Sequence, residues 1–476
     1  MLFNSIDFAV FLPIVFTIYW YLCCGNAQRQ NVALLVASLF FYAWWDWRFL
    51  GLLILVCLVS FFVGKSIEDS CKNGGNGKGA LCFGVLVNLG ILALFKYYDF
   101  FMSSFANVFL GGNADSLLLN LILPVGISFY LFQATGYCFD VYRKIVPAEK
   151  NWLIHFVFIC FFPQLLAGPI GRAKKILPQF REQRVFNPVL VADGFRQILW
   201  GLFKKMVVAD NCAEVVNIVW GGNIADASAS TLVLTAILYS FQIYGDFSGY
   251  SDIAIGSAKL FGVQLGDNFL FPYFSRNVGE FWRRWHISLN IWFRDYVYIP
   301  FGGSREGNWY TLRNILIVFG LSGLWHGANW TFVFWGLFHG LLFVPGIFFK
   351  KTKKDTFVVA QDSISPSLRE FSQILLTFFL VTLGWIFFRA PSIESAVEFV
   401  DSCFSLSLFS VPAVSGTPFI FIVLMLAIEW IHRRGTYGLW RMPALPRPIR
   451  WIFYICFIFF IVMNDGYQET FIYFKF

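Results

Sequence analysis

One histidine lies in an apolar segment rich in glycine and tryptophan, residues 322–330, with the sequence SGLWHGANW. An ionisable side chain at membrane depth is energetically costly, so His326 is a candidate for a functional role. Burial disfavours the imidazolium, and the neutral imidazole that remains can accept a proton. Gly323 allows a backbone or substrate to approach closely, and Trp325 and Trp330 could flank an apolar acyl chain. A structural histidine, bonded to a backbone carbonyl, is an equally good interpretation of the position alone.

A second segment, residues 280–300, mixes charged and aromatic residues in the sequence EFWRRWHISLNIWFRDYVYIP. Such mixing is typical of a membrane–water interface, and an interfacial helix whose arginines reach toward water accounts for most of it. That interpretation does not require His286. Arg283 and Arg294 could also bind the phosphates of an anionic ligand such as coenzyme A, because guanidinium groups form charge-assisted hydrogen bonds with phosphate.

Two further segments carry polar or helix-breaking residues within apolar surroundings. In QIYGDFSGYSDIAIG, residues 242–256, Asp246 or Asp252 could pair with an arginine of the second segment, although purely structural polar pairs fit the pattern equally well. In PQLLAGP, residues 163–169, proline and glycine interrupt an apolar run. This interruption indicates a broken helix and a loop with a structural role.

Several catalytic motifs are absent from the sequence. It contains no H-E-x-x-H motif and no Cys/His cluster, so a catalytic metal is not indicated. It also lacks a Walker-type phosphate loop and a G-x-S-x-G nucleophile elbow. The sequence therefore argues against an ATP-driven motor and against a hydrolase of the elbow type.

The composition indicates a polytopic membrane protein. Of the 476 residues, 58% are hydrophobic and 13% are charged, and a soluble domain could not cover so much apolar surface. The net charge is +8, but the basic residues cluster in loops between apolar runs. That distribution favours a role in membrane orientation over nucleic-acid binding. The run 8–24 lacks a basic start and a small-residue cleavage site, so it is expected to be a retained first helix.

The apolar runs predict an all-α membrane domain that covers residues 1–476, with a core at 117–390, a C-terminal helix at 451–463 and a tail at 464–476. Several runs are shorter than the roughly 20 residues that cross a bilayer, which indicates re-entrant helices that line a cavity. Segments 189–220 and 279–299 resemble interfacial helices. The predicted membrane helices are 8–24, 31–45, 49–64, 80–101, 117–140, 152–167, 231–247, 251–261, 312–326, 330–349, 371–389, 419–431 and 451–463.

The basic loops predict the orientation of the C-terminal third. One loop carries Lys350, Lys351, Lys353 and Lys354, and the other carries Arg433, Arg434, Arg441, Arg447 and Arg450. Two predicted helices separate the loops, so both should face one side, the cytoplasm. The tail should then lie outside. The helix at 312–326 should start on the cytoplasmic side, and its length of about 22 Å is less than the roughly 30 Å hydrocarbon core. His326 is therefore expected within the membrane, near a helix break.

The combination of segments resembles the membrane-bound O-acyltransferases, in particular the bacterial branch that includes the alginate O-acetylation protein and relatives acting on peptidoglycan, cellulose and teichoic acid. The resemblance covers nearly the whole chain. It rests on SFYLFQATGYCFDVYR at 128–143, FPQLLAGPIGRAKKILPQF at 162–180, QIYGDFSGYSDIAIG at 242–256, FWRRWHISLNIWFRDYVYIPFGG at 281–303, LSGLWHGANWTFVFWGLFHG at 321–340 and TLGWIFFRA at 382–390.

The resemblance implies that His326 is the catalytic histidine and His286 the second signature histidine. It implies a ring of about 11–13 transmembrane or re-entrant helices around a thinned centre with a tunnel, through which an acyl donor enters from the cytoplasm. The tail FIYFKF at 471–476 is similar to aromatic C-terminal tails of this branch. Tyr473 is accordingly expected to carry the acyl group briefly as an ester. An interfacial anchor is the alternative for this tyrosine, and Lys475 departs from the glutamine expected there.

The expected chemistry is acyl transfer by proximity and base catalysis. The tunnel aligns the thioester of acetyl-CoA with an acceptor hydroxyl such as that of Tyr473, and His326 accepts the proton. His286 or a backbone amide stabilises the oxyanion. No bound cofactor or metal is expected. The residues expected to bind the donor or line the tunnel are Trp325, Asn329, Trp330, Arg283, Trp282, Arg294, Asp295, Asp246, Ser248 and Gln242.

The partners expected are a periplasmic SGNH or esterase-like acetyltransferase, polysaccharide export machinery and membrane lipid, in the bacterial inner membrane. The final acceptor is expected to be an exported or cell-envelope polysaccharide, such as an alginate-like polymer, cellulose or peptidoglycan. A transporter or flippase of polysaccharide precursors would also have broken helices and intramembrane charges, but it predicts inverted repeats, and none is visible in the sequence. A non-catalytic scaffold of a secretion complex predicts that conservative changes at His326 are harmless.

Overall fold

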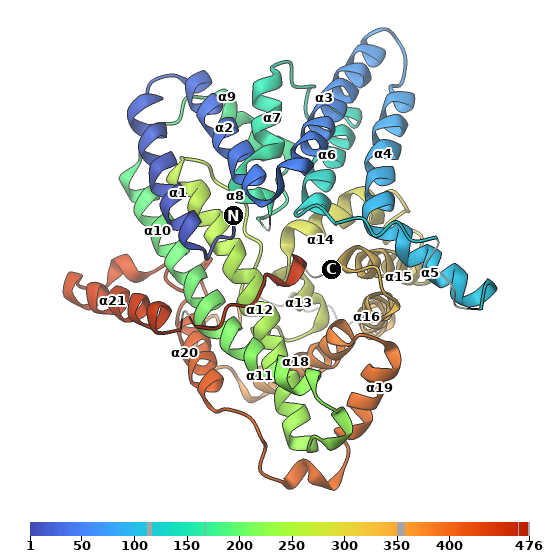
Figure 1. Ribbon diagram of the computed structural model, residues 1–476, viewed down its shortest axis with the longest axis vertical. Coiled ribbons are helices and arrows are strands. Elements are labelled where there is room, and N and C mark those ends of the chain that lie inside the picture. Colours follow the sequence, from blue (N-terminus) through green and yellow to red (C-terminus); the bar gives the residue numbers. More distant parts are fainter. Residues whose placement is uncertain (112–116, 167, 350–357, 465, 475–476) are drawn as a thin grey trace. The chain divides into compact units, whose positions relative to one another are not determined.

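The computed structural model describes residues 1–111, 117–166, 168–349, 358–464 and 466–474, which are helical and include no strand (Figure 1). The all-α prediction is therefore confirmed. The chain divides into two compact units, the first formed by residues 1–194 and 254–266 and the second by residues 195–253 and 267–476. The predicted basic loop with Lys350, Lys351, Lys353 and Lys354, and also Ala167 and Lys475, lie outside the described residues.

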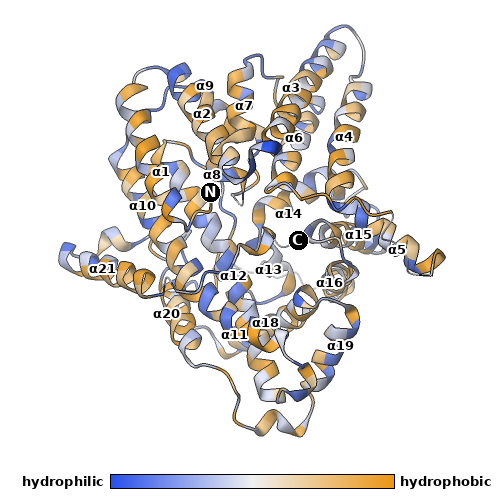
Figure 2. Ribbon diagram, viewed as in Figure 1, coloured by the Kyte–Doolittle hydropathy of each residue, from blue (hydrophilic) through white to orange (hydrophobic). Residues whose placement is uncertain are grey.

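The first unit consists of helices that bury apolar side chains and also a set of polar ones. Gln30 and Asn31 on α2 donate hydrogen bonds to the carbonyls of Arg184 and Phe180, at 2.9 and 2.8 Å, so buried amides hold the loop after α9. Figure 2 shows hydrophobic residues along α4. The helices are α1 (Ile6–Thr17), α2 (Ala27–Asp46), α3 (Leu50–Lys72), α4 (Lys78–Leu92), α5 (Tyr98–Phe109), α6 (Ile127–Tyr142), α7 (Trp152–Cys160), α8 (Phe162–Leu165) and α9 (Ala173–Arg181).

The second unit contains all the candidate site residues. Its boundary with the first unit falls within α10 (Pro188–Leu202) and α12 (Ala229–Leu260). Among the described residues of this unit, two π-helical turns, η4 (Phe203–Ala209) and η7 (Arg294–Tyr298), interrupt the α-helices, and such turns are frequent at functional sites. The other helices are α11 (Asp210–Gly221), α13 (Val278–Arg284), α14 (Ile287–Phe293), α15 (Asn308–His326), α16 (Trp330–Leu341), α17 (Val344–Phe348), α18 (Leu368–Arg389), α19 (Ile393–Ser402), α20 (Thr417–Ile431) and α21 (Arg447–Met463).

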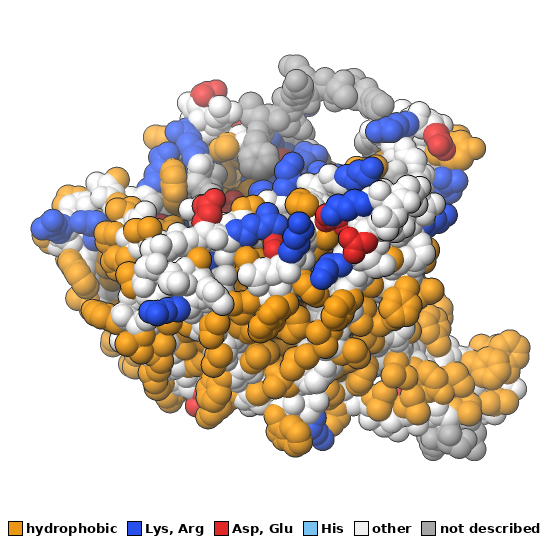
Figure 3. All heavy atoms as spheres, turned by 90° about the horizontal axis from the view of Figure 1, so that it is seen from above, with side chains coloured by type: hydrophobic (Ala, Val, Ile, Leu, Met, Phe, Trp, Pro, Cys, Tyr) orange, Lys and Arg blue, Asp and Glu red, His pale blue; other side chains and the backbone are white. Residues whose placement is uncertain are grey.

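Within the described residues, four helical stretches are long and apolar enough to cross a membrane: Ala27–Lys72, Lys78–Phe109, Trp330–Phe348 and Leu368–Arg389. Two shorter apolar helices, Ile6–Leu22 and Thr417–Ile431, accompany them. On the face shown in Figure 3, hydrophobic side chains cover large areas, and charged side chains gather in other areas. Apolar side chains exposed in this way require lipid as their solvent.

The polar segment at 242–256 does not break a helix, and this corrects the prediction of separate helices at 231–247 and 251–261. The segment lies inside one continuous helix, α12 (Ala229–Leu260). Its glycines are places of close helix contact, since a Cβ atom on Gly249 would lie 2.8 Å from the carbonyl oxygen of Gly201. The buried aspartates of α12 are neutralised by lysines of η4, as described below. Packing and charge pairing therefore override the local signals for a break.

Other predicted helix boundaries also differ from those in the structure. The run 117–140 becomes helical only at Ile127, because Pro124 and the left-handed Gly126 (φ 73°) precede the helix. The run 152–167 is split into α7 and α8, consistent with the predicted break around Pro163. The helix that ends at His326 begins at Asn308 and has 19 residues. At about 28 Å its length matches the bilayer core, so helix length alone does not place His326 at mid-depth.

Helices α15 and α16 form a tight hairpin because glycines face each other's backbone. A Cβ atom on Gly323 would lie 2.1 Å from the carbonyl oxygen of Phe332, and one on Gly336 would lie 2.1 Å from that of Phe319. Real Cβ atoms do not approach backbone oxygens so closely, so these positions require glycine. The hairpin carries His326 at its turn, and its packing therefore sets the position of the imidazole.

We expect Gly336→Ala to destabilise the protein by about 1–3 kcal/mol or more, because the added methyl group overpacks the hairpin. Thermal unfolding of the purified protein in detergent measures the change. Gly346→Ala on α17 is the matched control, since a Cβ atom there meets no atom within 4 Å. Equal melting temperatures for the two variants would contradict the packing argument.

Candidate functional site

The residues that follow His326 end helix α15 and start the next helix. α15 ends at His326, Gly327 is extended (φ −160°), and the side chain of Asn329 accepts a hydrogen bond from the Thr331 amide as the N-cap of α16. Asn329 also donates to the carbonyl of Pro391 at 3.0 Å. The predicted helix break after His326 is confirmed, and Asn329 supports this turn.

His326 faces Tyr473, which lies 147 residues away in the sequence. The Tyr473 hydroxyl is hydrogen-bonded to Nδ1 of His326 at 3.0 Å. His326 is 2% exposed. Besides the ring of Tyr473 at 5.6 Å, the imidazole contacts Trp325 and Trp335, each at 4.9 Å between ring centroids, and Phe388 at 5.4 Å. The ring contacts fix the imidazole in a dry site with its nitrogen directed at the phenol.

Tyr473 belongs to the C-terminal tail, which runs back from α21 past α12 (Figure 1). Its ring packs on Phe247 of α12 at 4.5 Å and on Phe471 at 5.6 Å, and Phe471 stacks on Tyr250 at 4.2 Å. Burial raises the pKa of the Tyr473 phenol well above its usual value. The phenol is therefore neutral at physiological pH and needs a base before it can act as a nucleophile.

The His326–Tyr473 pair has the geometry of a base and a hydroxyl nucleophile. In the imidazole tautomer that carries its hydrogen on Nε2, Nδ1 accepts the phenolic hydrogen at the observed distance. A base within about 2.6–3.2 Å of the proton it abstracts meets the geometric condition for general base catalysis. The pair can thus activate the phenol toward an electrophilic carbonyl.

His286 flanks the same tyrosine from another element. It is the N-cap of α14 with a left-handed backbone (φ 43°, ψ 54°), and its Nδ1 is hydrogen-bonded to Oδ1 of Asn268 at 3.0 Å. Its ring lies 6.5 Å from that of Tyr473 and 6.0 Å from that of Trp325. A left-handed non-glycine residue is strained and persists only where its surroundings hold it. The structure thus brings His286, Trp325, His326 and Tyr473 into one cluster.

Asp246 pairs with a lysine rather than with an arginine, which corrects the pairing considered from the sequence. Its Oδ1 lies 2.8 Å from Nζ of Lys205, and Lys205 also binds Asp210 at 2.7 Å. Asp252 pairs in turn with Lys204 at 2.7 Å, and Lys204 donates to Ser248 at 2.8 Å. These lysines were not chosen from the sequence, although the adjacent pair within the apolar stretch GLFKKMVVAD is a signal that could have identified them.

The remaining predicted residues lie in three places. Trp282 packs on Trp335 at 5.7 Å and thereby adjoins the ring contacts of His326. Arg283 and Arg294 are exposed, and Arg294 is paired with Asp295 at 2.8 Å. Gln242 is buried, and within the described residues no hydrogen bond reaches its side-chain oxygen. Trp330, at the start of α16, is 53% exposed. Binding of donor phosphates by Arg283 and Arg294 stays a prediction, as does the tunnel.

Several residues of the cluster were missed by sequence reasoning. Phe388 and Trp335 contact the imidazole, Phe247 and Phe471 contact the phenol, and Asn268 holds His286. Aromatic residues make up 20% of the chain, so their type does not distinguish these positions. Only the three-dimensional contacts select them.

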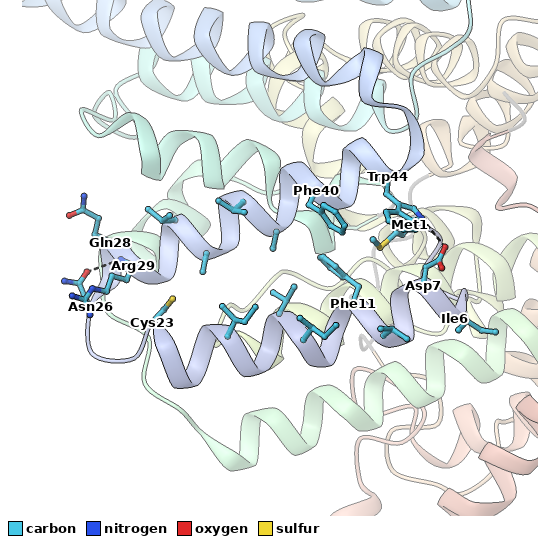
Figure 4. A pocket seen from close by; sticks show the side chains of 18 residues that line it. Met1, Ile6, Asp7, Phe11, Cys23, Asn26, Gln28, Arg29, Phe40 and Trp44 are labelled. Carbon is cyan, nitrogen blue, oxygen red and sulfur yellow. Dashed lines mark hydrogen bonds between the residues drawn. The ribbon is translucent and has the colours of Figure 1, made fainter.

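A large pocket lies elsewhere, in the first unit between α1 and α2 (Figure 4). Its volume is about 1050 Å³, and it is lined mostly by apolar side chains. Phe11 and Phe40 stack across it at 6.2 Å, and Trp44 donates to Asp7 at one end. None of the candidate site residues lines it. Its volume therefore does not locate the chemistry, whereas the paired imidazole and phenol do.

Comparisons with known proteins identify the family of the chain. Residues 151–388 match the membrane-bound O-acyltransferase family. The probable alginate O-acetylase AlgI of Azotobacter vinelandii is 36% identical over 407 residues, covering 85% of this chain and 78% of the relative. The peptidoglycan O-acetyltransferase of Helicobacter pylori is 36% identical over 429 residues, covering 84% and 79%.

A more distant relative is the teichoic acid D-alanyltransferase of Bacillus subtilis, 29% identical over 286 residues, covering 56% of this chain and 69% of the relative. These matches do not support the transporter alternative. The family match includes His286 and His326, and the alginate and peptidoglycan relatives extend over most of the chain. The chain therefore belongs to the membrane-bound O-acyltransferase family and is an O-acyltransferase.

Proposed function

We propose that the protein takes an acetyl group from acetyl-CoA on the cytoplasmic side, holds it as an ester on Tyr473, and delivers it outside for O-acetylation of an exported or cell-envelope polysaccharide. The observation that carries the proposal is the 3.0 Å hydrogen bond between the Tyr473 hydroxyl and Nδ1 of His326. A buried, neutral phenol has no nucleophilic role without a base, and this phenol has one in contact.

The cluster residues and the donor together account for every bond and proton in the transfer step. The Tyr473 oxygen attacks the thioester carbonyl while Nδ1 of His326 removes the phenolic proton. The tetrahedral oxyanion is stabilised by His286 or a backbone amide. The C–S bond then breaks, the thiolate of coenzyme A takes the proton from His326, and an acetyl ester remains on Tyr473. Transfer to a second hydroxyl repeats the attack at the ester carbonyl and frees the phenol.

The proposed orientation is the bacterial inner membrane with the tail outside. It is supported by the loops of the second unit, where Arg433 donates to the carbonyls of Val359 and Ala360, each at 3.0 Å. The loop before α18 and the loop after α20 therefore lie side by side, as the positive-inside argument requires. Between them the chain passes through α19, whose acidic residues include Glu394. Figure 2 shows hydrophilic residues on this helix.

The acceptor and partners are proposed from the relatives. The names of the relatives given above refer to alginate and to peptidoglycan as acceptors. We propose an acceptor polysaccharide of this class, reached through a periplasmic SGNH or esterase-like acetyltransferase and the export machinery. An acyl-tyrosine ester is reactive enough for transfer to a sugar hydroxyl, because a phenolate is a better leaving group than an alkoxide.

Mass spectrometry of the tail tests the proposal. The purified protein is incubated with acetyl-CoA, quenched in acid and digested, and the peptides are searched for acetyl groups. We expect donor-dependent acetylation of Tyr473 that is removed by hydroxylamine, as expected for a phenolic ester. Acetyl groups found on other residues, or on none, would overturn the carrier role of the tail.

A further inference from the structure

We infer that Lys205, Asp210 and Asp246 form a buried clamp that fixes the C-terminal tail and thereby positions the Tyr473 hydroxyl on His326. We call these three residues the tail clamp. The inference rests on the proposed function, since the clamp has a purpose in the reaction only if Tyr473 carries the acetyl group. None of the three residues touches His326, so they are positioning residues and not catalytic ones.

The ammonium group of Lys205 joins two helices to the tail. It donates hydrogen bonds to Oδ1 of Asp210 and to the carbonyl of Glu469, each at 2.7 Å, and lies 2.8 Å from Oδ1 of Asp246. An ammonium has three N–H donors, and three oxygens surround this one. One of those oxygens belongs to the tail backbone. The surroundings of the Lys205 charge are therefore complete only when the tail is docked.

The carboxylate of Asp246 holds the tail at a second point, next to the reactive tyrosine. Its Oδ2 accepts a hydrogen bond from the backbone amide of Ile472 at 2.7 Å. Ile472 directly precedes Tyr473. The Lys205 and Asp246 side chains are 0% and 4% exposed, and in such a dry site charge-assisted hydrogen bonds are strong and specific in direction. Two backbone contacts thus fix the tail on both sides of Phe471.

The tail also has contacts that do not involve the clamp. Phe471 is buried against Tyr250, and Asn217 donates to the Tyr467 hydroxyl and to Glu469 at 3.0 and 2.6 Å. These contacts hold the earlier part of the tail and its apolar ring. The backbone hydrogen bond at Ile472 is what sets the direction of the next side chain. Loss of the clamp should therefore loosen residues 472–474 without releasing the whole tail.

A neighbouring ion pair provides a matched control. Asp252 lies on the same helix as Asp246, its Oδ2 is 2.7 Å from Nζ of Lys204, and its Oδ1 accepts a hydrogen bond from Gln197 at 2.7 Å. In each aspartate one oxygen thus lies in an ion pair with a buried lysine, and the other oxygen accepts a hydrogen bond. Asparagine at either position would turn one oxygen into a donor and lose one contact. Only the Asp246 contact belongs to the tail.

Hydrogen–deuterium exchange of the tail in the full-length protein tests the clamp. We expect Asp246→Asn to speed exchange of the peptide covering residues 468–474 by about tenfold or more, which corresponds to about 1.4 kcal/mol. Asp252→Asn should leave the exchange of that peptide unchanged. Unchanged exchange in Asp246→Asn, or equal acceleration in both variants, would overturn the inference.

Acylation kinetics distinguish a misplaced tail from a general loss of folded protein. With the tail misplaced, Asp246→Asn should lower the rate of tail acetylation at saturating acetyl-CoA by about tenfold, with an unchanged KM for the donor. A raised KM with an unchanged maximal rate would contradict a positioning role. Faster exchange in Asp246→Asn, together with a wild-type protein that carries no acetyl group on Tyr473, would support the clamp and reject the proposed function.

Discussion

His326→Ala should reduce donor-dependent acylation by about 10²–10⁴-fold, the usual contribution of a general base. The Tyr473 hydroxyl would then have no proton acceptor at Nδ1, and burial keeps this phenol neutral. The initial rate of acetyl transfer from labelled acetyl-CoA to the purified protein measures the loss. Asn or Gln at position 326 should not restore the rate, because an amide cannot take up the proton.

The loss must be separated from the damage caused by removing a buried imidazole. His155→Ala in the first unit is the control, since His155 is fully buried and hydrogen-bonded to Ser60 at 2.8 Å. That variant should be destabilised but should retain acylation in the fraction that remains folded. If His326→Ala were acylated at the wild-type rate, His326 would not be the base.

Tyr473→Phe should abolish the covalent acetyl group on the tail while leaving the fold in place. The substitution removes the hydroxyl that His326 contacts but keeps the ring that packs on Phe247 and Phe471. The lost hydrogen bond should cost only about 0.5–1.5 kcal/mol of stability. Acetyl incorporation, and acetylation of the exported polysaccharide in cells that carry only this variant, are the two measurements.

Tyr467→Phe is the matched control for this substitution. Tyr467 is a second tail tyrosine, and its hydroxyl donates to Glu469 at 2.8 Å, away from His326. We expect full acetyl incorporation in this variant. A Tyr473→Phe protein that still acetylated the polysaccharide normally would show that Tyr473 only anchors the tail, which is the alternative for an aromatic residue at a membrane interface.

The segment around His286 shows what could be predicted from the sequence and what could not. The mixed segment at 280–300 was expected to be interfacial, and Arg283 and Arg294 are indeed exposed. The same segment nevertheless buries His286 against Phe247 at 4.6 Å, because a left-handed residue turns the chain between α13 and α14. Composition predicts the environment of a segment on average, whereas a single backbone torsion decides the direction of one side chain.

The C-terminal tail shows that contacts between distant residues cannot be predicted from local sequence patterns. The residues of the tail indicated only an aromatic tail with a tyrosine, and the expectation that Tyr473 reaches His326 came from the family resemblance alone. The contact between Tyr473 and His326 joins residues 147 positions apart, and that between Ile472 and Asp246 joins residues 226 positions apart. Such contacts depend on how loops close and helices pack, and no local pattern encodes them.

The sequence by itself determined the all-helical membrane class, most helix positions and the helix end at His326, because apolar periodicity, glycine and capping residues act over a few residues. The tertiary structure alone decided that Lys205 pairs with Asp246 and that both side chains bind the backbone of the tail. The physical reason is that a buried charge selects whatever partner the packing brings within a few ångströms, and that choice is made between elements distant in the chain.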